Sequence, residues 1–552
     1  MRKNLLPHWL VIVALAVGTL ASARPAVADM KPMVVVAFSG YNELHKDLEY
    51  IGKISDVPEL GNSLDGMIAL LTQFQGLVGL DKSKPWGAAV SSDGQIFQTV
   101  AFLPVTDTKK LLGALQGMVG EPQDAGDGVQ QIRAGAMPLF LKEKNGWAFI
   151  AQMPDQLADL PADPQTLISS LTKTYDLAVR INAQNIPQQF RDLAINQIKL
   201  GMQSGLDRQA DETDAQYQVR VKLMQQQIDQ LVQLINELDE LLIGWAIDAQ
   251  NRLAFLDISM TAVPGSKLAA NAAAASVIKS KFTGFLENED AVIDAHVASK
   301  QGDQDIATTV ATIQSLKSSV FDSIDKSDDL KDDEKPVIKK AVEETFESIE
   351  ATAKKGVIDG GMVIVGEGPF TIVAGGSVEK AGKLESAFRQ AMSVAKRQPD
   401  APEVEYDVDK HAGVTFHSIS GPWPDDADEN VKQVLGDDIE ITVAFGEDRV
   451  FVALGEDGVD TIKDVIDDSQ SAEQSKLPFE LDVWVKPILE YSAEQQPDNP
   501  ILKLIADTLG DEDGIHLTSR MIPNGALARL EFDEGVLKAI GTAANAAKAG
   551  RP

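Results

Sequence analysis

The sequence lacks cysteine altogether, and aromatic side chains make up only 6% of its 552 residues. Without thiols the chain forms no disulfide, and it contains neither a cysteine nucleophile nor a cysteine-ligated zinc site. Small exported domains depend on disulfides most, whereas a chain of this length can bury ample core in two or more domains. The missing thiols therefore exclude thiol chemistry but not export.

Positive charge is also scarce, because 50 Lys and Arg residues face 83 Asp and Glu residues, for a net charge of −33. Nucleic acids and anionic lipid headgroups bind through Lys and Arg side chains, which displace counterions. We therefore expect no nucleic-acid partner. The hydrophobic content of 44% is ordinary for a globular protein and excludes a disordered chain.

Long apolar runs are missing as well, and the most continuous apolar stretch lies near the N-terminus. Residues 1–4 include two basic side chains, residues 9–17 are apolar, and two A-x-A sites follow at 21–23 and 26–28. Basic start, short apolar middle and small-residue end are the three parts of a secretory signal. A membrane anchor would need about 20 apolar residues. The pattern predicts a signal peptide over residues 1–28.

Cleavage is expected after Ala28, with Ala23 as the alternative site. Removal takes away Arg2, Lys3 and Arg24 and no acidic residue, so the mature chain would carry −33 − 3 = −36. We expect an exported chain, periplasmic or extracellular, with no transmembrane segment after signal removal.

The chain also resembles itself. Residues 97–114 (FQTVAFLPVTDTKKLLGA) match 370–387 (FTIVAGGSVEKAGKLESA) at an offset of 273. Three further matches follow in the same order: 146–151 with 448–453, 175–181 with 479–485, and the hairpin at Asn251–Arg252 with that at Asn524–Gly525. Collinear matches of this kind predict an internal duplication. We therefore expect two related modules in tandem, 29–285 and 286–552.

Each module is predicted to be α+β, a mostly antiparallel sheet with helices packed on one face. In the first module Tyr175, Leu177, Val179 and Ile181 alternate with polar residues, which indicates a strand whose apolar face is buried. Turn residues between apolar runs favour tight hairpins. They are Asp93–Gly94, Asn145–Gly146, Gly446–Asp448 and Asn524–Gly525.

The first module is expected to contain an inserted helical hairpin, at about 186–242. Its second helix carries a heptad pattern. The apolar positions are Tyr217, Val221, Met224, Ile228, Leu231, Ile235, Leu238 and Leu242. We favour packing of this pattern inside the chain; self-association through the 217–242 helix is the alternative. The second module is expected to hold a different helical pair at about 305–354.

Signatures of catalysis are missing from the sequence: it has no H-E-x-x-H, no G-x-S-x-G, no P-loop and no complete G-x-G-x-x-G. No catalytic residue and no cofactor are predicted. His411 and His417 are six residues apart and would share a face of one regular strand, but a histidine pair without a placed carboxylate is a weak metal signal.

The strongest metal candidate is an acidic stretch for calcium, formed by Asp426, Asp428, Asn430 and Asp437. Its spacing resembles the EF-hand loop, whose ligands are carboxylate and amide oxygens. The stretch departs from that pattern because Val431 replaces the glycine of the sharp turn, and Asp437 replaces the final glutamate. A plain acidic loop is the simpler interpretation.

These observations favour an exported, non-enzymatic protein that binds a partner or belongs to the structure of the cell envelope. One alternative is a carrier for an apolar ligand such as a lipid, because segments such as 441–446 and 449–455 have apolar or small residues on both faces. Another is an unrecognised hydrolase, since a site assembled from distant residues leaves no local motif.

Overall fold

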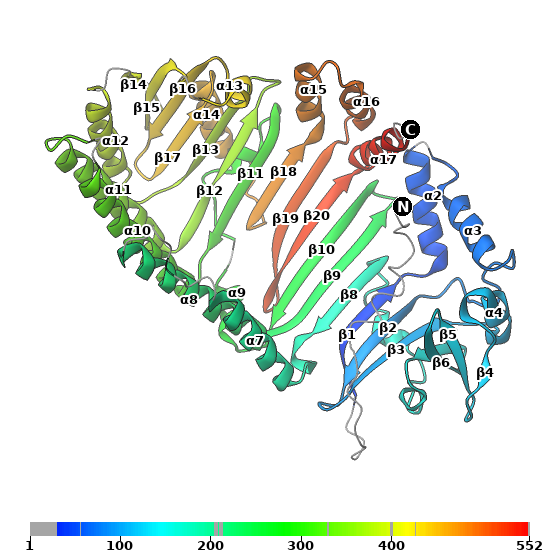
Figure 1. The fold of residues 1–552 in the computed structure, drawn as a ribbon. Coiled ribbons are helices and arrows are strands. Elements are labelled where there is room, and N and C mark those ends of the chain that lie inside the picture. Colours follow the sequence, from blue (N-terminus) through cyan, green and yellow to red (C-terminus); the bar gives the residue numbers. More distant parts are fainter. Residues whose placement is uncertain are drawn as a thin grey trace. The chain divides into compact units, whose positions relative to one another are not determined.

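The computed structural model describes residues 30–549, apart from 56, 204–207, 209–213, 276, 328–329, 398–400 and 425–426. The chain divides into two compact units. The first comprises Met1–Asn196 with Leu238–Met260, and the second comprises Gln197–Glu237 with Thr261–Pro552. Both mix helices with antiparallel strands, as expected for the α+β class (Figure 1).

The strands of the first unit follow the order β10-β9-β8-β1-β2-β3-β7-β6-β5-β4, with antiparallel registers. Their bounds are β1 Lys31–Phe38, β2 Trp86–Ser92, β3 Phe97–Pro104, β4 Gln123–Asp124, β5 Val129–Ala134, β6 Met137–Lys144, β7 Trp147–Ala151, β8 Leu177–Asn182, β9 Leu238–Asp248 and β10 Leu253–Ala262.

The strands of the second unit follow the order β20-β19-β18-β11-β12-β13-β17-β16-β15-β14, and every neighbouring pair is antiparallel. Their bounds are β11 Ala291–Lys300, β12 Val357–Val365, β13 Thr371–Ser377, β14 Glu403–His411, β15 Val414–Pro422, β16 Asp438–Phe445, β17 Arg449–Leu454, β18 Phe479–Trp484, β19 Gly514–Ile522 and β20 Gly525–Asp533.

Helices occupy the connections between strands. In the first half of the chain they are α2 Tyr41–Ile54, α3 Leu60–Leu71, α4 Thr108–Ala114, α5 Gln116–Val119, α6 Gln165–Ile168, α7 Gln188–Gln203, α8 Asp214–Glu237 and α9 Lys267–Ala274. In the second half they are α10 Asp303–Lys326, α11 Lys335–Lys355, α12 Ala381–Ala395, α13 Glu429–Leu435, α14 Gly458–Ser471, α15 Val485–Gln495, α16 Pro500–Leu509 and α17 Glu534–Ala549.

Four predicted turns join strands as expected. Asn145 and Gly146 both have positive φ, 53° and 78°, between β6 and β7. Two consecutive residues with φ > 0 match the twist of the flanking strands, which is why Asn-Gly is a preferred hairpin pair. Between β19 and β20 only Asn524 has positive φ, 60°, because Gly525 already pairs with Ile522 as the first residue of β20.

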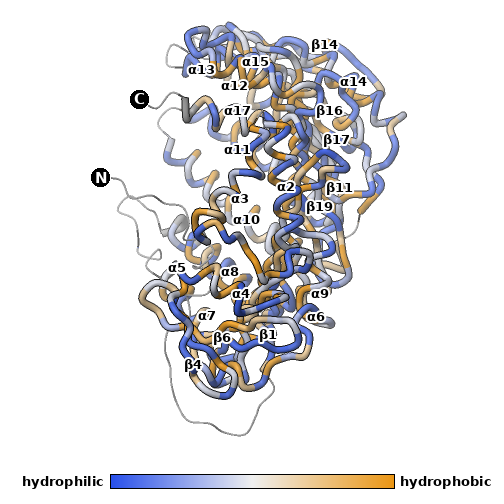
Figure 2. Tube along the Cα trace, turned by 90° about the vertical axis from the view of Figure 1, so that its right-hand side faces the viewer, coloured by the Kyte–Doolittle hydropathy of each residue, from blue (hydrophilic) through white to orange (hydrophobic). Residues whose placement is uncertain are grey.

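Each unit has its own core. The first core gathers around Phe102 and Phe149, and the second around Phe416 and Phe451. Figure 2 shows hydrophobic and hydrophilic residues alternating along the elements that enclose these cores. Among the described residues, no helix combines the length and apolarity that a bilayer crossing requires.

The buried face of β8 is the opposite of the predicted one. Leu177 is 40% exposed, whereas Ala178 on the other face is 1% exposed and belongs to the first core. Tyr175 is buried in the same core, but it precedes the strand. The alternation was predicted correctly; the buried face was wrong because a small alanine fits against the bulky aromatic residues of the core.

The predicted heptad helix ends earlier than expected. Helix α8 stops at Glu237, and Leu238 and Leu242 lie on β9. The helix contacts α9 and α10. Ile228 is buried, while Leu231 is 38% exposed. The heptad pattern therefore predicted a helix that runs too far, across the boundary between α8 and β9. The error arose because Leu238 and Leu242 fit the helical spacing and also suit an apolar strand.

Candidate functional site

An open hollow of the first unit lies where β1 passes into α2. Gly40 adopts φ 119° at this junction, and a Cβ there would lie 2.8 Å from the Lys84 carbonyl oxygen. Only glycine fits such a position. The hollow, about 450 Å³, is the α2–α3 pocket; its lining residues are Tyr41, Asn42, Glu43, His45, Lys46, Asp65, Lys82 and Ser83.

The polar groups of the α2–α3 pocket are paired with one another. The Tyr41 hydroxyl donates to Asp65, and His45 Nε2 lies 3.3 Å from the other oxygen of Asp65. His45 Nδ1 lies 3.5 Å from Glu49. The Lys82 ammonium sits 4.4 Å from the centre of the Tyr41 ring, a cation–π contact.

Burial, reinforced by the hydrogen bond to Asp65, raises the pKa of Tyr41 to about 12. The same hydrogen bond, with His45 nearby, lowers the pKa of Asp65. Tyr41 therefore stays protonated at neutral pH and serves as a donor, not as a base. Ser83 donates to Asp81 at 2.6 Å, so its proton is directed away from His45. The arrangement supplies hydrogen bonds and charge but no activated nucleophile.

A second cluster in the other unit has ligand-type atoms close together. Glu385, Asp407 and His417 place one ligand atom each within 4.8 Å of one another, the one such group among the described residues. His417 is fully buried, and its Nε2 has no hydrogen-bond partner. The Arg389 guanidinium joins the two carboxylates, at 2.8 Å from Glu385 and 2.9 Å from Asp407.

The hydrogen bonding of His417 argues against a metal at this cluster. Its Nδ1 accepts the backbone N–H of Asp407 at 3.0 Å, which places the imidazole proton on Nε2. Burial and the charge of Arg389 lower the pKa of His417, so the ring is neutral. A protonated Nε2 directed at Glu385, 3.5 Å away, is a donor and not a metal ligand. The cation of this cluster is Arg389.

The expected His411–His417 pair is wrong in its geometry. His411 ends β14, a hairpin follows, and His417 lies on β15. His411 pairs with Val414, which faces the opposite side of β15 from His417. His411 instead contacts Asp467 at 2.7 Å. The Ala412–Gly413 turn, with positive φ at both residues, was not recognised in the sequence.

A buried serine, histidine and aspartate also meet in the second unit. Ser280 Oγ lies 2.8 Å from His296 Nε2 and donates to Asp359 at 2.6 Å. In a catalytic triad the serine proton goes to histidine, and the aspartate holds the far nitrogen of that ring. Here the serine proton goes to Asp359, and all three side chains are buried. The group ties β11 and β12 to the preceding segment.

A charged row crosses β11, β18 and β19. Asp294 pairs with Asp482, and Asp482 pairs with His516, so the three side chains share a face. Burial, together with Asp482, raises the pKa of Asp294 to about 7. A hydrogen bond to Asp482, with Asp533 nearby, raises the pKa of His516 to about 9. Near pH 7 the row therefore holds an acid that still keeps a proton about half of the time, beside an imidazolium–carboxylate pair.

The residues of the calcium hypothesis are only partly brought together. Asp426 lies outside the described residues. Asp428 caps α13, accepting the backbone N–H of Asn430 at 2.9 Å and its side-chain amide at 2.8 Å. Asn430 lies in the first turn of α13, and the rest of that helix separates it from Asp437, which is exposed. The cap uses one of the two carboxylate oxygens of Asp428.

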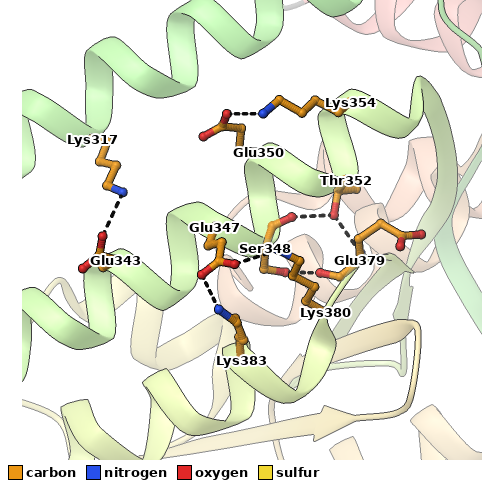
Figure 3. A network of polar contacts seen from close by, with 10 residues as sticks. All are labelled: Lys317, Glu343, Glu347, Ser348, Glu350, Thr352, Lys354, Glu379, Lys380 and Lys383. Carbon is orange, nitrogen blue, oxygen red and sulfur yellow. Dashed lines mark hydrogen bonds and ion pairs between the residues drawn. The ribbon is translucent and has the colours of Figure 1, made fainter.

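The helices of the second unit carry an ion-pair network (Figure 3). Glu347 of α11 binds both Lys380 and Lys383, which lowers its pKa to about 2. Within the network Ser348 is fully buried and donates to the Glu379 carbonyl oxygen. These contacts join α10, α11 and α12 and leave no group poised for chemistry among the residues drawn.

A second, shallow hollow of about 560 Å³ is also lined mostly by polar and charged residues: Lys340, Gly382, Glu385, Ser386, Arg389, Gln390 and Ser393. Neither hollow is the lined apolar cavity that a lipid carrier needs. The α2–α3 pocket went unrecognised in the sequence because its residues come from three separate segments. The glycine before Tyr41 was the one local signal.

Comparisons with known proteins give no matching family model, no similar curated protein and no similar solved structure.

Proposed function

We propose that this chain is an exported, non-catalytic protein of the cell envelope, built on a duplicated ten-stranded scaffold. The strand order carries the proposal. Every strand of the first unit corresponds to the strand numbered ten higher in the second unit, from β10/β20 at one end to β4/β14 at the other. The same correspondence, strand by strand, is a strong sign of common descent of the two halves.

The sequence matches support the same correspondence. Residues 97–114 and 370–387 fall on β3 with α4 and on β13 with α12. The remaining matches fall on β7/β17, β8/β18 and the β9–β10/β19–β20 hairpins. Helix pairs also occupy equivalent connections: α2–α3 and α10–α11 after the first strand, α7–α8 and α15–α16 after the eighth.

The non-catalytic role is supported by how the polar clusters are used. Tyr41 is held protonated, Nδ1 of His417 accepts a backbone N–H, and Ser280 donates to a carboxylate. In each cluster internal hydrogen bonds therefore take up groups that a reaction would need. The N-terminal signal pattern supports work outside the cytoplasm.

Two measurements test this proposal. Mass spectrometry of the chain recovered from cell fractions should find it outside the cytoplasm and beginning at Asp29. If a strain without the gene has an envelope defect, the wild-type chain and the Tyr41→Phe/His45→Gln variant should correct that defect equally well. A full-length chain in the cytoplasm contradicts export. Failure of the folded pocket variant to complement contradicts a non-catalytic scaffold.

A further inference from the structure

The end of α3 exposes a group of large apolar side chains. Met67 is 51% exposed, Leu70 70%, Leu71 45%, Phe74 80% and Val78 50%. We call these five residues the α3 apolar tip. Met67, Leu70 and Leu71 occupy positions i, i+3 and i+4 on one face of α3, and Phe74 follows in the turn after the helix ends at Leu71. In a protein core these side chains would be buried, whereas here they face outward.

The exposure of Phe74 is fixed by the turn that holds it. Thr72, which is 1% exposed, donates its hydroxyl to Ile68 at 2.7 Å and accepts the backbone N–H of Gly76 at 2.8 Å. Gln73 and Phe74 both have positive φ, 53° and 64°. Such a backbone is costly for a bulky aromatic residue and persists only where its surroundings enforce it. The turn therefore presents Phe74 outward in a defined position.

The charge of this segment differs from that of the rest of the chain. Residues 66–80 contain no Asp, Glu, Lys or Arg, although such residues make up 24% of the sequence. Asp65 precedes this stretch, and Asp81 follows it together with Lys82 and Lys84; Lys84 pairs with Asp81 at 3.2 Å. The tip itself thus lacks the acidic groups that elsewhere would repel a phosphate-bearing surface.

The tip has no counterpart in the second unit. There α11 ends at Lys355, and Gly356 alone leads into β12. In the first unit, residues 72–85 separate α3 from β2. A segment that extends only one of two corresponding connections is not required by the shared scaffold, so its exposed apolar residues need another explanation.

We propose that the α3 apolar tip inserts into the interfacial region of a lipid bilayer. This inference rests on the proposed envelope location. Exposed Met and Leu side chains at a helix end, followed by an exposed Phe in the turn and with no acidic residue among them, have the chemistry of interfacial insertion. Because the mature chain carries about 36 net negative charges in the predicted form, apolar insertion and not attraction to anionic headgroups provides the affinity.

The absence of cysteine allows a direct test. Phe74→Cys in the chain isolated after export provides a single site for an environment-sensitive dye. Leu200→Cys, at a position 61% exposed on α7, provides the matched control. Phosphatidylcholine vesicles should shift the emission of the dye at position 74 to the blue and leave the dye at position 200 unchanged. No shift at position 74, or equal shifts at both positions, overturns the proposal.

Substitution then tests the contribution of the side chains. Leu70→Ser/Phe74→Ser should weaken vesicle binding at least tenfold, whereas Leu193→Ser/Leu200→Ser, at positions 55% and 61% exposed, should not. An equal loss of vesicle binding in both variants contradicts insertion through the α3 apolar tip. A dye shift that depends on protein concentration without vesicles assigns the tip to a second copy instead. If the chain binds vesicles but is found in the cytoplasm, only the proposed function is contradicted. If the chain is found in the envelope but does not bind vesicles, only the membrane insertion of the α3 apolar tip is contradicted.

Discussion

At the residue scale, Asp294 is buried beside a second carboxylate, and one of its oxygens has no hydrogen-bond partner among the described residues. Its folded pKa of about 7 lies above the unfolded value near ~3.9. The folded state therefore holds a proton that the unfolded state releases, so this contribution to stability falls as pH rises from about 4 to 7.

Asp294→Asn removes that pH dependence. We expect the free energy of unfolding to rise by about 1–3 kcal/mol at pH 8 and to change little near pH 4, as measured by urea denaturation. The exposed Asp437→Asn serves as the control at both pH values. A destabilised Asp294→Asn at pH 8 would show that the carboxylate is needed in its charged form.

His516 is a basic group, but its contribution to stability also falls as pH rises. Its pKa is raised to about 9 by Asp482, so its stabilising contribution is complete below about 6.5 and is lost as pH rises through 9. His516→Gln should therefore cost about 1–2 kcal/mol at pH 6 and much less at pH 10. Equal losses at the two pH values would mean that packing against Trp484, 5.4 Å away between ring centres, matters more than charge.

At the element scale, the α11–α12 contact separates buried from exposed polar interactions. Ser348→Ala leaves the Glu379 carbonyl without its buried donor and should lower the free energy of unfolding by about 1–2 kcal/mol. Glu343→Ala, which breaks an exposed pair with Lys317, should cost less than about 0.5 kcal/mol. Similar costs for both variants in thermal unfolding would contradict this ranking.

The turn after α3 predicts an unusual separation of stability from function. Phe74→Gly removes a large apolar side chain, yet it should not lower the free energy of unfolding, because Phe74 is 80% exposed and has φ 64°. Relief of about 1 kcal/mol of backbone strain offsets the extra chain entropy of glycine. Vesicle binding by the same variant should be lost. A clear drop in melting temperature would show that Phe74 packs against the protein.

Elements differ in how far the sequence predicts them. Hairpins at Asn145 and Asn524 were predicted because Asn-Gly fixes the backbone locally. The buried face of β8 was not, since Leu177 and Ala178 both suit a strand and only the aromatic core decides between them. The α8 boundary was missed for a related reason: Leu238 continues the helical spacing and also begins a strand. The α2–α3 pocket depends on contacts between distant segments, which no local pattern records.

At the scale of the whole molecule, the two units have the same strand order but differ in the helices that connect the strands. The strand order repeats, but α10 and α11 are 24 and 21 residues long where α2 and α3 have 14 and 12. The longer pair carries the ion-pair network, and the shorter pair carries the α2–α3 pocket and the apolar tip. The connection after the first strand is therefore one place where the two units differ in what they carry; the connection after the eighth strand is another, with α7 and α8 of 16 and 24 residues against α15 and α16 of 11 and 10.

Net charge is the other property of the whole chain. It allows general screening by salt to be distinguished from specific binding of a cation. An excess of 33 acidic over basic side chains repels itself, so raising NaCl from roughly 20 to 200 mM should raise the melting temperature. Calcium should add no more than magnesium at equal concentration, because Asp428 already caps α13 and the helix separates it from Asp437. A larger shift with calcium that Asp428→Ala abolishes, together with heat on calcium addition in calorimetry, would establish the calcium site and overturn this expectation.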